Sequence, residues 1–189
     1  MAVNGVNKID LFEKSILESI DFSDNPLKVE HGVSPSNAGE NLIMRPLNTE
    51  DYDKGYLELL THLTVVGDIS KEKFIERFAE MKSCKGSYYI VVIEDISKGR
   101  IIGSGTLAVE MKYIHKAALR GRVEDIVVDK NYRKRHLGKL IVDTLTILSQ
   151  QIGCYKTSLD CKEALIPFYG QFGFSREEDR NYLCKRFFN

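Results

Sequence analysis

The sequence lacks several features that would place it in whole classes of protein. No Cys-x-x-Cys pair occurs among its four cysteines, and its four histidines show no chelating spacing with them. We therefore expect free thiols and no metal site. No apolar stretch approaches the roughly 20 residues that span a bilayer, and the N-terminus has no basic segment followed by an apolar run. We expect a cytoplasmic protein without an integral membrane segment.

Net charge is also absent, because 27 lysines and arginines balance 27 aspartates and glutamates. A balanced chain has no global attraction to nucleic acid, so each basic cluster must be judged by its local surroundings. With 189 residues, 43% hydrophobic and 29% charged, the composition is ordinary for a globular protein with one sizeable core. We expect one folded domain and no nucleic-acid partner.

The first forty residues differ from the rest of the chain. Residues 10–20 have the apolar spacing of a short amphipathic helix behind a possible Asp10 cap. Residues 21–40 contain two prolines and have no periodicity, which predicts a connector or a segment that lies over the surface of the domain. We expect an N-terminal extension over residues 1–40 and the folded domain over residues 41–189.

The domain alternates strand and helix patterns. Apolar runs bounded by turn residues predict strands, and apolar residues at helical spacing behind capping residues predict helices. Their order predicts a mixed α/β fold, with a central sheet of about six strands and helices on both faces. The predicted elements are a strand at 41–44, helices behind caps at Asn48 or Thr49 and at Ser70, strands at 87–94, 100–112 and 121–129, a helix at 138–151 ended by Gly153, a strand at 155–160, a short helix at 163–172 and a last strand at 181–188.

The segment 121–140 combines a buried strand, a basic turn and a helix start. The strand carries apolar side chains on both faces, which is typical of a central strand: Val123, Ile126, Val127 and Val128. The helix that starts near Gly138 has free backbone N–H groups and the positive end of a helix dipole. Four basic residues accompany that start: Arg133, Lys134, Arg135 and Lys139. The segment predicts a site for a phosphorylated ligand.

The turn Arg133-Lys134-Arg135-His136-Leu137-Gly138 resembles the coenzyme A signature of the GNAT family of N-acetyltransferases. His136 stands where the general pattern has glycine, so it must adopt a turn geometry that other residues tolerate. From about residue 41 to the C-terminus the chain is similar to the glucosamine 6-phosphate branch of that family. The segments that carry this resemblance are 121–126, 137–140, 153–156, 159–161, 168–169 and 172–174.

The resemblance implies a GNAT fold and acetyl-CoA as co-substrate. It implies acetyl transfer to the 2-amino group of glucosamine 6-phosphate by direct attack, giving N-acetylglucosamine 6-phosphate for UDP-N-acetylglucosamine synthesis. Acetyl-CoA would lie along the strand 124–128 with its pyrophosphate at the turn 133–139. The coenzyme-binding residues would be Ile126, Val127, Val128, Arg133, Lys134, Arg135, His136, Leu137, Gly138, Lys139 and Tyr169.

Glu124 and Asp125 are adjacent acids in an apolar strand. Alternate strand residues face opposite sides, so we expect only one of the two to point into a given cleft. They either form an ion pair with Arg120 or Arg122, or bind an amine and take its proton as it attacks. The resemblance favours the second interpretation and places both acids on the substrate side.

Tyr169 follows Pro167 and Phe168 in a short predicted helix, where an aromatic side chain most often belongs to the core. The resemblance instead places its phenol beside the sulfur of coenzyme A, which leaves as a thiolate that a phenol can protonate. Asp160 ends a predicted strand at the rim where ligands of open sheets collect, although it could equally cap the following helix. We expect these catalytic residues: Tyr169, Glu124, Asp125 and Asp160.

Substrate recognition rests on the resemblance alone. Lys112, His115 and Lys185 match the phosphate-binding positions of the branch, the last of them offered across a homodimer interface. Lys185 stands where the branch has arginine, so the adjacent Arg186 can take that role. An unpaired apolar strand at 181–188 would favour aggregation, so we expect it to be exchanged in the dimer. The substrate-binding set is Thr64, Lys112, His115, Glu124, Asp125, Ile126, Asp160, Lys185 and Arg186.

Two alternatives stay open. A GNAT enzyme could act on another amine, such as a protein N-terminus, a polyamine or an aminoglycoside. A non-catalytic acyl-CoA-binding module could also retain the fold, although the four expected catalytic residues argue against decay. No cysteine lies in a Cys-His arrangement that would favour a covalent intermediate.

Overall fold

A computed structural model describes residues 8–178 and 181–187 of the chain. Its core is one sheet with the strand order β1-β2-β3-β4-β5, in which β1 to β4 pair antiparallel and β5 pairs parallel with β4. This mixed sheet confirms the predicted fold class. The strands are β1 (Leu42–Pro46), β2 (Tyr88–Asp95), β3 (Arg100–Met111), β4 (Leu119–Val128) and β5 (Cys154–Ser158).

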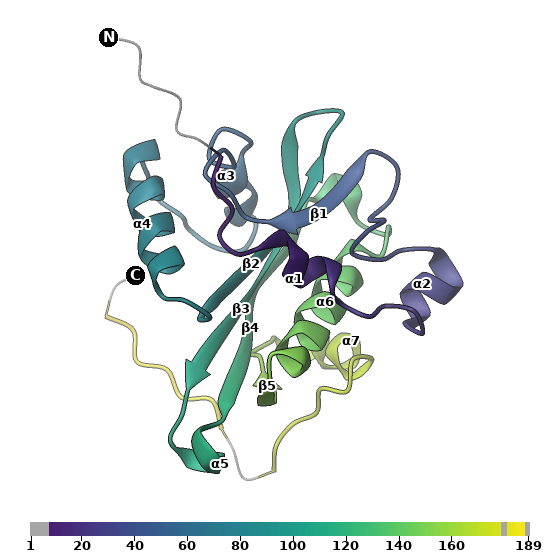
Figure 1. Ribbon diagram of the computed structural model, residues 1–189, viewed down its shortest axis with the longest axis vertical. Helices are drawn as coiled ribbons and strands as arrows, with labels where there is room; N and C mark the ends of the chain where they lie inside the picture. The colour runs from purple at the N-terminus through teal and green to yellow at the C-terminus, as the bar shows by residue number, and fades with distance from the viewer. Residues whose placement is uncertain (1–7, 179–180, 188–189) are drawn as a thin grey trace.

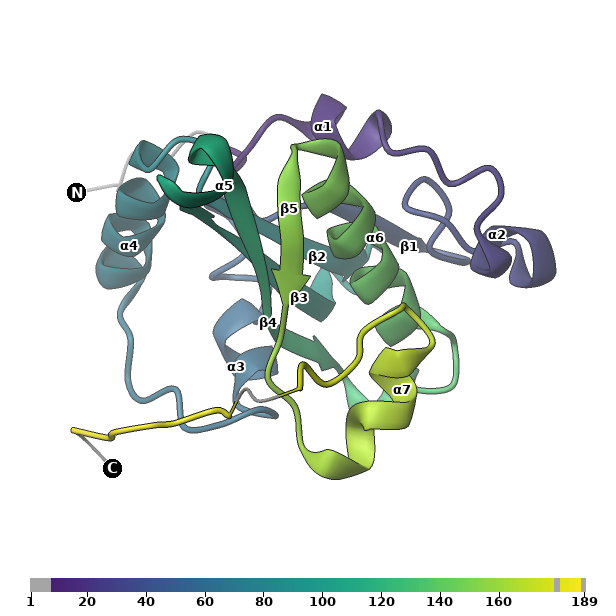
Figure 2. The same ribbon diagram turned by 90° about the horizontal axis from the view of Figure 1, so that it is seen from below.

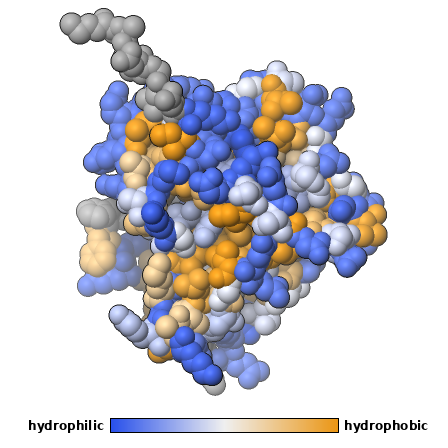
Figure 3. All heavy atoms as spheres, in the orientation of Figure 1, coloured by the Kyte–Doolittle hydropathy of each residue, from blue (hydrophilic) through white to orange (hydrophobic). Residues whose placement is uncertain are grey.

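Helices lie on both faces of the sheet, with α3 and α4 on one side and α6 and α7 on the other (Figures 1 and 2). Figure 3 shows polar side chains over much of one face, with apolar side chains gathered in its middle and lower part. The helices are α1 (Lys14–Glu18), α2 (Pro26–His31), α3 (Tyr56–Leu60), α4 (Lys71–Ser83), α5 (Ile114–Ala117), α6 (Leu137–Gln151) and α7 (Ile166–Gly170), with 3-10 turns η1 (Lys130–Tyr132) and η2 (Glu163–Leu165).

The helix α6 supplies much of the core. Its inward face was predicted from helical spacing and is buried: Leu140, Ile141, Thr144, Leu145 and Leu148. The helix lies so close to β3 that a Cβ atom at Gly105 would come 2.5 Å from Ile141. The predicted end is also confirmed, because Gly153 has a left-handed φ of 88°.

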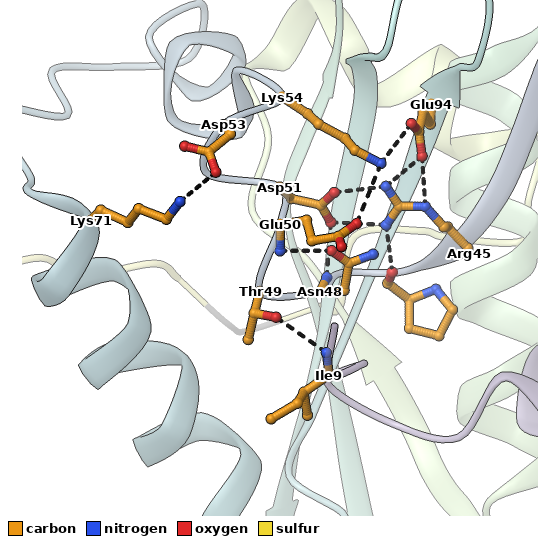
Figure 4. A network of polar contacts seen from close by, with 11 residues as sticks. Ile9, Arg45, Asn48, Thr49, Glu50, Asp51, Asp53, Lys54, Lys71 and Glu94 are labelled. Carbon is orange, nitrogen blue, oxygen red and sulfur yellow. Dashed lines mark hydrogen bonds and ion pairs between the residues drawn. The ribbon is translucent and has the colours of Figure 1, made fainter. Parts of the chain in front are cut away.

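The predicted cap of the first domain helix is wrong. Asn48 and Thr49 precede a series of turns, and α3 begins only after Gly55. Buried Asp51 instead accepts hydrogen bonds from the Asn48 N–H, at 2.8 Å, and from the Arg45 guanidinium, at 2.6 and 2.8 Å. Arg45 also donates to the Glu94 carboxylate, which accepts a further hydrogen bond from Lys54 at 2.8 Å (Figure 4). Burial alone would raise the pKa of Glu94, but these two cations hold it below its usual value.

The N-terminal segment packs into the same core as the domain. The N–H of Leu11 bonds the Leu47 carbonyl at 2.8 Å, and the apolar side chains of residues 11–27 join the core cluster. The expected Asp10 cap is wrong, since α1 starts after Glu13. The expected connector contains α2, whose start is fixed by the Asn25 side chain accepting from the Leu27 N–H at 2.9 Å. Pro26 occupies the first turn, where its missing N–H costs nothing.

Within the described residues the sheet has five strands, where about six were expected. Residues 181–187 form no strand with the described part of their own chain, and residue 188 lies outside the described residues. Large apolar side chains in this segment are exposed: Tyr182, Leu183 and Phe187. Exchange of this segment in a dimer stays a prediction.

Candidate active site

The two central strands of the candidate site separate halfway along β4. Parallel pairing of β4 with β5 runs from Leu119 with Cys154 to Arg122 with Ser158 and ends there. From Val123 onward, β4 has no strand partner on that side within the described residues. The backbone N–H and C=O groups along this open edge can pair with an extended ligand as a further strand would.

A β-bulge sits at the point of separation. Ser104 pairs with Val127 and Thr106 with Glu124, so Asp125 and Ile126 together oppose the single residue Gly105. Asp125 has a left-handed φ of 53°. Ile126 approaches the position of a Gly105 Cβ atom to 2.6 Å, on the side of α6. The bulge therefore shifts the alternation of the strand by one residue.

This shift overturns the expectation that Glu124 and Asp125 point to opposite faces. Glu124 lies on the face of Arg122, whose Nε donates to it. The charge of Asp125 acts on the buried Tyr56 phenol of α3, on the face away from α6, and raises its pKa after burial, the larger cause. Both acids thus lie on the α3 side of β4. Periodicity alone could not reveal this, because Asp125 carries no sequence signal for a bulge such as a glycine.

Arg122 links the two strands across the opening. Its guanidinium forms ion pairs with Glu124 on β4 and with Asp160, two residues beyond β5. The structure thus realises the ion-pair interpretation of Glu124. It also assembles three charged, partly exposed side chains at the mouth of the gap, where a polar ligand can exchange hydrogen bonds with them.

Asp125 has an electrostatic environment unlike that of Glu124. Burial, and secondarily the like charge of Glu124, raise the pKa of the Asp125 carboxyl above its ordinary value. The residue as a whole is exposed to solvent, so protons can reach the carboxylate. A carboxylate with a raised pKa is a stronger proton acceptor than an ordinary one.

The basic turn leads into α6 as predicted. His136 is the N-cap residue with a left-handed φ of 60°, so it adopts the glycine-like geometry that the motif requires. Lys134 is also left-handed, with a φ of 66°. The Arg135 guanidinium lies 5.1 Å from the centre of the Tyr132 ring. A Cβ atom at Gly138 would lie 4.0 Å from Val128 of β4 and from Phe168, so this turn faces the open strand edge and α7.

Tyr169 is half-buried in α7, beside Phe168 at 5.0 Å and Phe174 at 6.2 Å between ring centres. Burial, and secondarily the neighbouring Cys161, raise the pKa of its phenol. The hydroxyl therefore stays protonated at neutral pH and can act as a hydrogen-bond donor or acid.

The predicted sugar-phosphate residues do not form one cluster within the chain. Lys112 pairs with Glu110, and the His115 ring lies 4.4 Å from the Tyr155 ring, both at the β3–β4 turn. Thr64 is exposed in the segment after α3. The helix α3 and the β3–β4 turn with α5 lie at opposite ends of the sheet (Figure 1). Lys185 and Arg186 are exposed in the C-terminal segment.

A hollow of about 1000 Å³ is formed by a different set of residues. It is lined by α3, residues 66–70 and the β2–β3 turn, and it contains none of the predicted site residues. Among the described residues no cluster of three or more His, Cys, Asp or Glu could hold a metal ion. Nor does any helix in the described ranges have both the length and the apolar character to cross a bilayer.

The profile of the acetyltransferase (GNAT) family matches residues 52–174, and the chain belongs to this family.

Individual relatives show which members of the family the chain is similar to. The chain is 46% identical over 165 residues to a probable glucosamine 6-phosphate N-acetyltransferase of Drosophila melanogaster, covering 87% of this chain and 75% of the relative. It is 42% identical over 138 residues to glucosamine 6-phosphate N-acetyltransferase 1 of Dictyostelium discoideum, covering 73% and 87%. The crystal structure of glucosamine-6-phosphate N-acetyltransferase from Arabidopsis thaliana aligns with a TM-score of 0.74 at 36% identity, covering 78% of this chain and 99% of that one.

Proposed function

We propose that the protein transfers the acetyl group of acetyl-CoA to the 2-amino group of glucosamine 6-phosphate. The observation that carries this proposal is the opening between β4 and β5, where an unpaired strand edge, two acids and the basic α6 turn converge. The names of the relatives specify the sugar, and the 46% and 42% identities extend over most of the chain.

Acetyl-CoA would lie along β4 between Ile126 and Val128, pairing its amide groups with the open strand edge. Its pyrophosphate would sit at the N–H groups that begin α6, beside the basic turn 133–139. The absence of crowding around Gly138 leaves room for the coenzyme between β4 and α7. No cofactor beyond this co-substrate enters the proposal.

The amine would attack the thioester carbonyl directly. As the C–N bond forms and the C–S bond breaks, the nitrogen loses a proton to Asp125 or Glu124, and the leaving sulfur takes one from Tyr169. The raised pKa of Asp125 suits the first transfer, and the protonated phenol suits the second. Arg122 would hold Asp160 and Glu124 at the sugar.

The sugar phosphate would require a second copy of the chain. Exposed Lys185 and Arg186 lie in the C-terminal segment 181–187, which pairs with no strand among the described residues of its own chain. Apolar residues at the β3–β4 turn are also exposed, among them Met111 and Tyr113. Pairing between copies would cover these surfaces and bring the two cations to the partner's site. The four free cysteines fit a reducing cytoplasm.

A thiol-release assay with acetyl-CoA and a panel of amines tests the function. We expect rapid release with glucosamine 6-phosphate, much slower release with glucosamine, and background release with a peptide or a polyamine. A faster reaction with either of the last two would support another acceptor. Coenzyme binding without release in any arm would support a binding module.

A further inference from the structure

The N-terminal helix α2 lies against the start of α6, next to the proposed coenzyme turn. Leu27 of α2 is buried in the core, and Asn25, which caps α2, lowers the pKa of Asp143 on α6 against the larger effect of burial. At the other end of α2, the imidazole ring of His31 stacks on that of His136, with ring centres 4.0 Å apart and planes inclined by 13°. The segment that precedes the domain thus contacts the residue that begins the coenzyme helix.

The charges around the two imidazoles are mostly positive. Glu30 is the nearest acid, with its carboxylate 3.8 Å from His31 Nε2. Burial, then His31 and then Lys139, lower the pKa of His136, so this ring is neutral at neutral pH. The charged groups on the elements that meet here are Lys28, Glu30, Arg133, Lys134, Arg135, Lys139 and Asp143.

An anion at this turn would reverse that balance. A phosphate or pyrophosphate beside two stacked imidazoles favours the imidazolium form and can accept a charge-assisted hydrogen bond from it. His31 keeps 38% of its side-chain surface exposed, so the ring is reachable from solvent.

We propose that His31 belongs to the binding site for the phosphates of the coenzyme, where it forms with His136 a pair that takes up a proton when the coenzyme binds. The proposal rests on the coenzyme placement given under Proposed function and extends it to α2. The proton comes from solvent, so coenzyme affinity rises as the pH falls.

Calorimetry on the full chain tests this pair, using coenzyme A in buffers of different ionisation enthalpy. Between about pH 8 and about pH 6 we expect the wild-type protein to take up protons and to gain roughly tenfold in affinity. His31→Phe keeps a ring for stacking but cannot ionise, so we expect less proton uptake and a flatter pH dependence. His31→Asn should behave alike, and it replaces the Phe variant should that one melt early. Lys28→Ala, on the same helix, should behave as wild type.

The ionisation of the ligand's own phosphates is the same for the wild-type protein and its variants, so it cancels when their proton uptakes are compared. Equal proton uptake by the wild-type protein and both His31 variants, with normal binding, would overturn the histidine pair and leave the proposed function standing. Failure of the wild-type protein to bind coenzyme A would overturn both.

Discussion

Arg122 on β4 holds Asp160 across the point where β4 and β5 part. The same guanidinium pairs with Glu124, so one cation fixes two acids on opposite walls of the opening. Its position at the last paired residue of β4 means that it organises the acids without closing the gap.

Replacing Arg122 by glutamine should impair activity more than stability. The three charged groups are partly exposed, and such ion pairs contribute about 0–1 kcal/mol to the free energy of unfolding. Without the cation the two acids repel each other, and we expect kcat/KM for the amine to fall roughly tenfold or more. Lys156→Gln is the matched control, since Lys156 on the neighbouring strand β5 forms a 2.8 Å ion pair with Glu177 that this change removes. Equal losses in both variants would contradict the role of Arg122.

Tyr169→Phe should lower kcat by about 10² to 10⁴ while coenzyme binding holds, because only the hydroxyl is lost. Burial raises the pKa of this phenol, so wild-type activity should not decline from its ionisation until strongly alkaline pH. Steady-state kinetics and calorimetry separate the two effects. Tyr88→Phe, at a half-buried tyrosine of β2, serves as control. An unchanged kcat for Tyr169→Phe would mean that Tyr169 only packs in the core and takes no part in the reaction.

Asp125→Asn should stabilise the protein and lower its activity. The folded-state pKa of Asp125 is raised, so its ionisation opposes folding above the unfolded-state pKa. Asparagine tolerates the left-handed φ, so at about pH 7 we expect a Tm above that of the wild-type protein. The gain should vanish as the pH falls to about 3.

Asp143 on α6 offers a comparison for this prediction. Burial raises its pKa too, against the effects of Asn25 and Lys139. Asp143→Asn should therefore show a similar pH trend in melting without loss of acetyl transfer. Full activity in Asp125→Asn would remove Asp125 from the proton-transfer step.

Two substitutions at Gly138 test coenzyme binding separately from folding. A Cβ atom there has 4.0 Å to its nearest neighbours, so Gly138→Ala should fold and melt like wild type. The methyl groups of valine would extend into the space between β4 and α7 where we place the coenzyme. Calorimetry should show at least tenfold weaker coenzyme binding for Gly138→Val with little change in Tm. Equal binding by both variants would argue that the coenzyme lies elsewhere.

Mixed dimers test the shared phosphate site. Chains with Lys185→Ala and Arg186→Ala should bind glucosamine 6-phosphate weakly but keep their coenzyme affinity, because the ligands use different cations. Mixed with Tyr169→Phe chains, they should regain part of the activity, since one site of each mixed dimer carries neither lesion. A fully active monomer in light scattering would contradict the proposed dimer. No recovery of activity in verified mixed dimers would contradict the proposed sharing of the phosphate site between chains.

The sequence predicted the parts of the fold that depend on local pattern. The inward face of α6, the β2–β3 hairpin and the Ser70 cap, which accepts from the Lys73 N–H at 3.3 Å, follow from periodicity and capping. The α2 helix was missed because six residues are too few to show a period. The cap at Asn48 was misplaced because Asp51 competes for the local backbone and binds distant Arg45.

The candidate site divides along the same line. The left-handed geometry of His136 was predicted from its place in the motif, and the structure confirms it. The basic turn was recognised from its charge. The shared face of Glu124 and Asp125 depends on a bulge opposite Gly105, a tertiary pairing that strict alternation cannot express. The contact of His31 with His136 joins residues more than a hundred positions apart, which no local pattern predicts.

A crystal structure with coenzyme A bound tests the central claim most directly, that the opening between β4 and β5 is the active site. We expect the pantetheine arm to pair with the β4 backbone near Ile126 and Val128, the pyrophosphate to lie at the N-terminus of α6, and the sulfur to lie within hydrogen-bond reach of the Tyr169 hydroxyl. Coenzyme A bound instead in the hollow of about 1000 Å³ between α3 and the β2–β3 turn, with the β4 edge empty, would contradict the account.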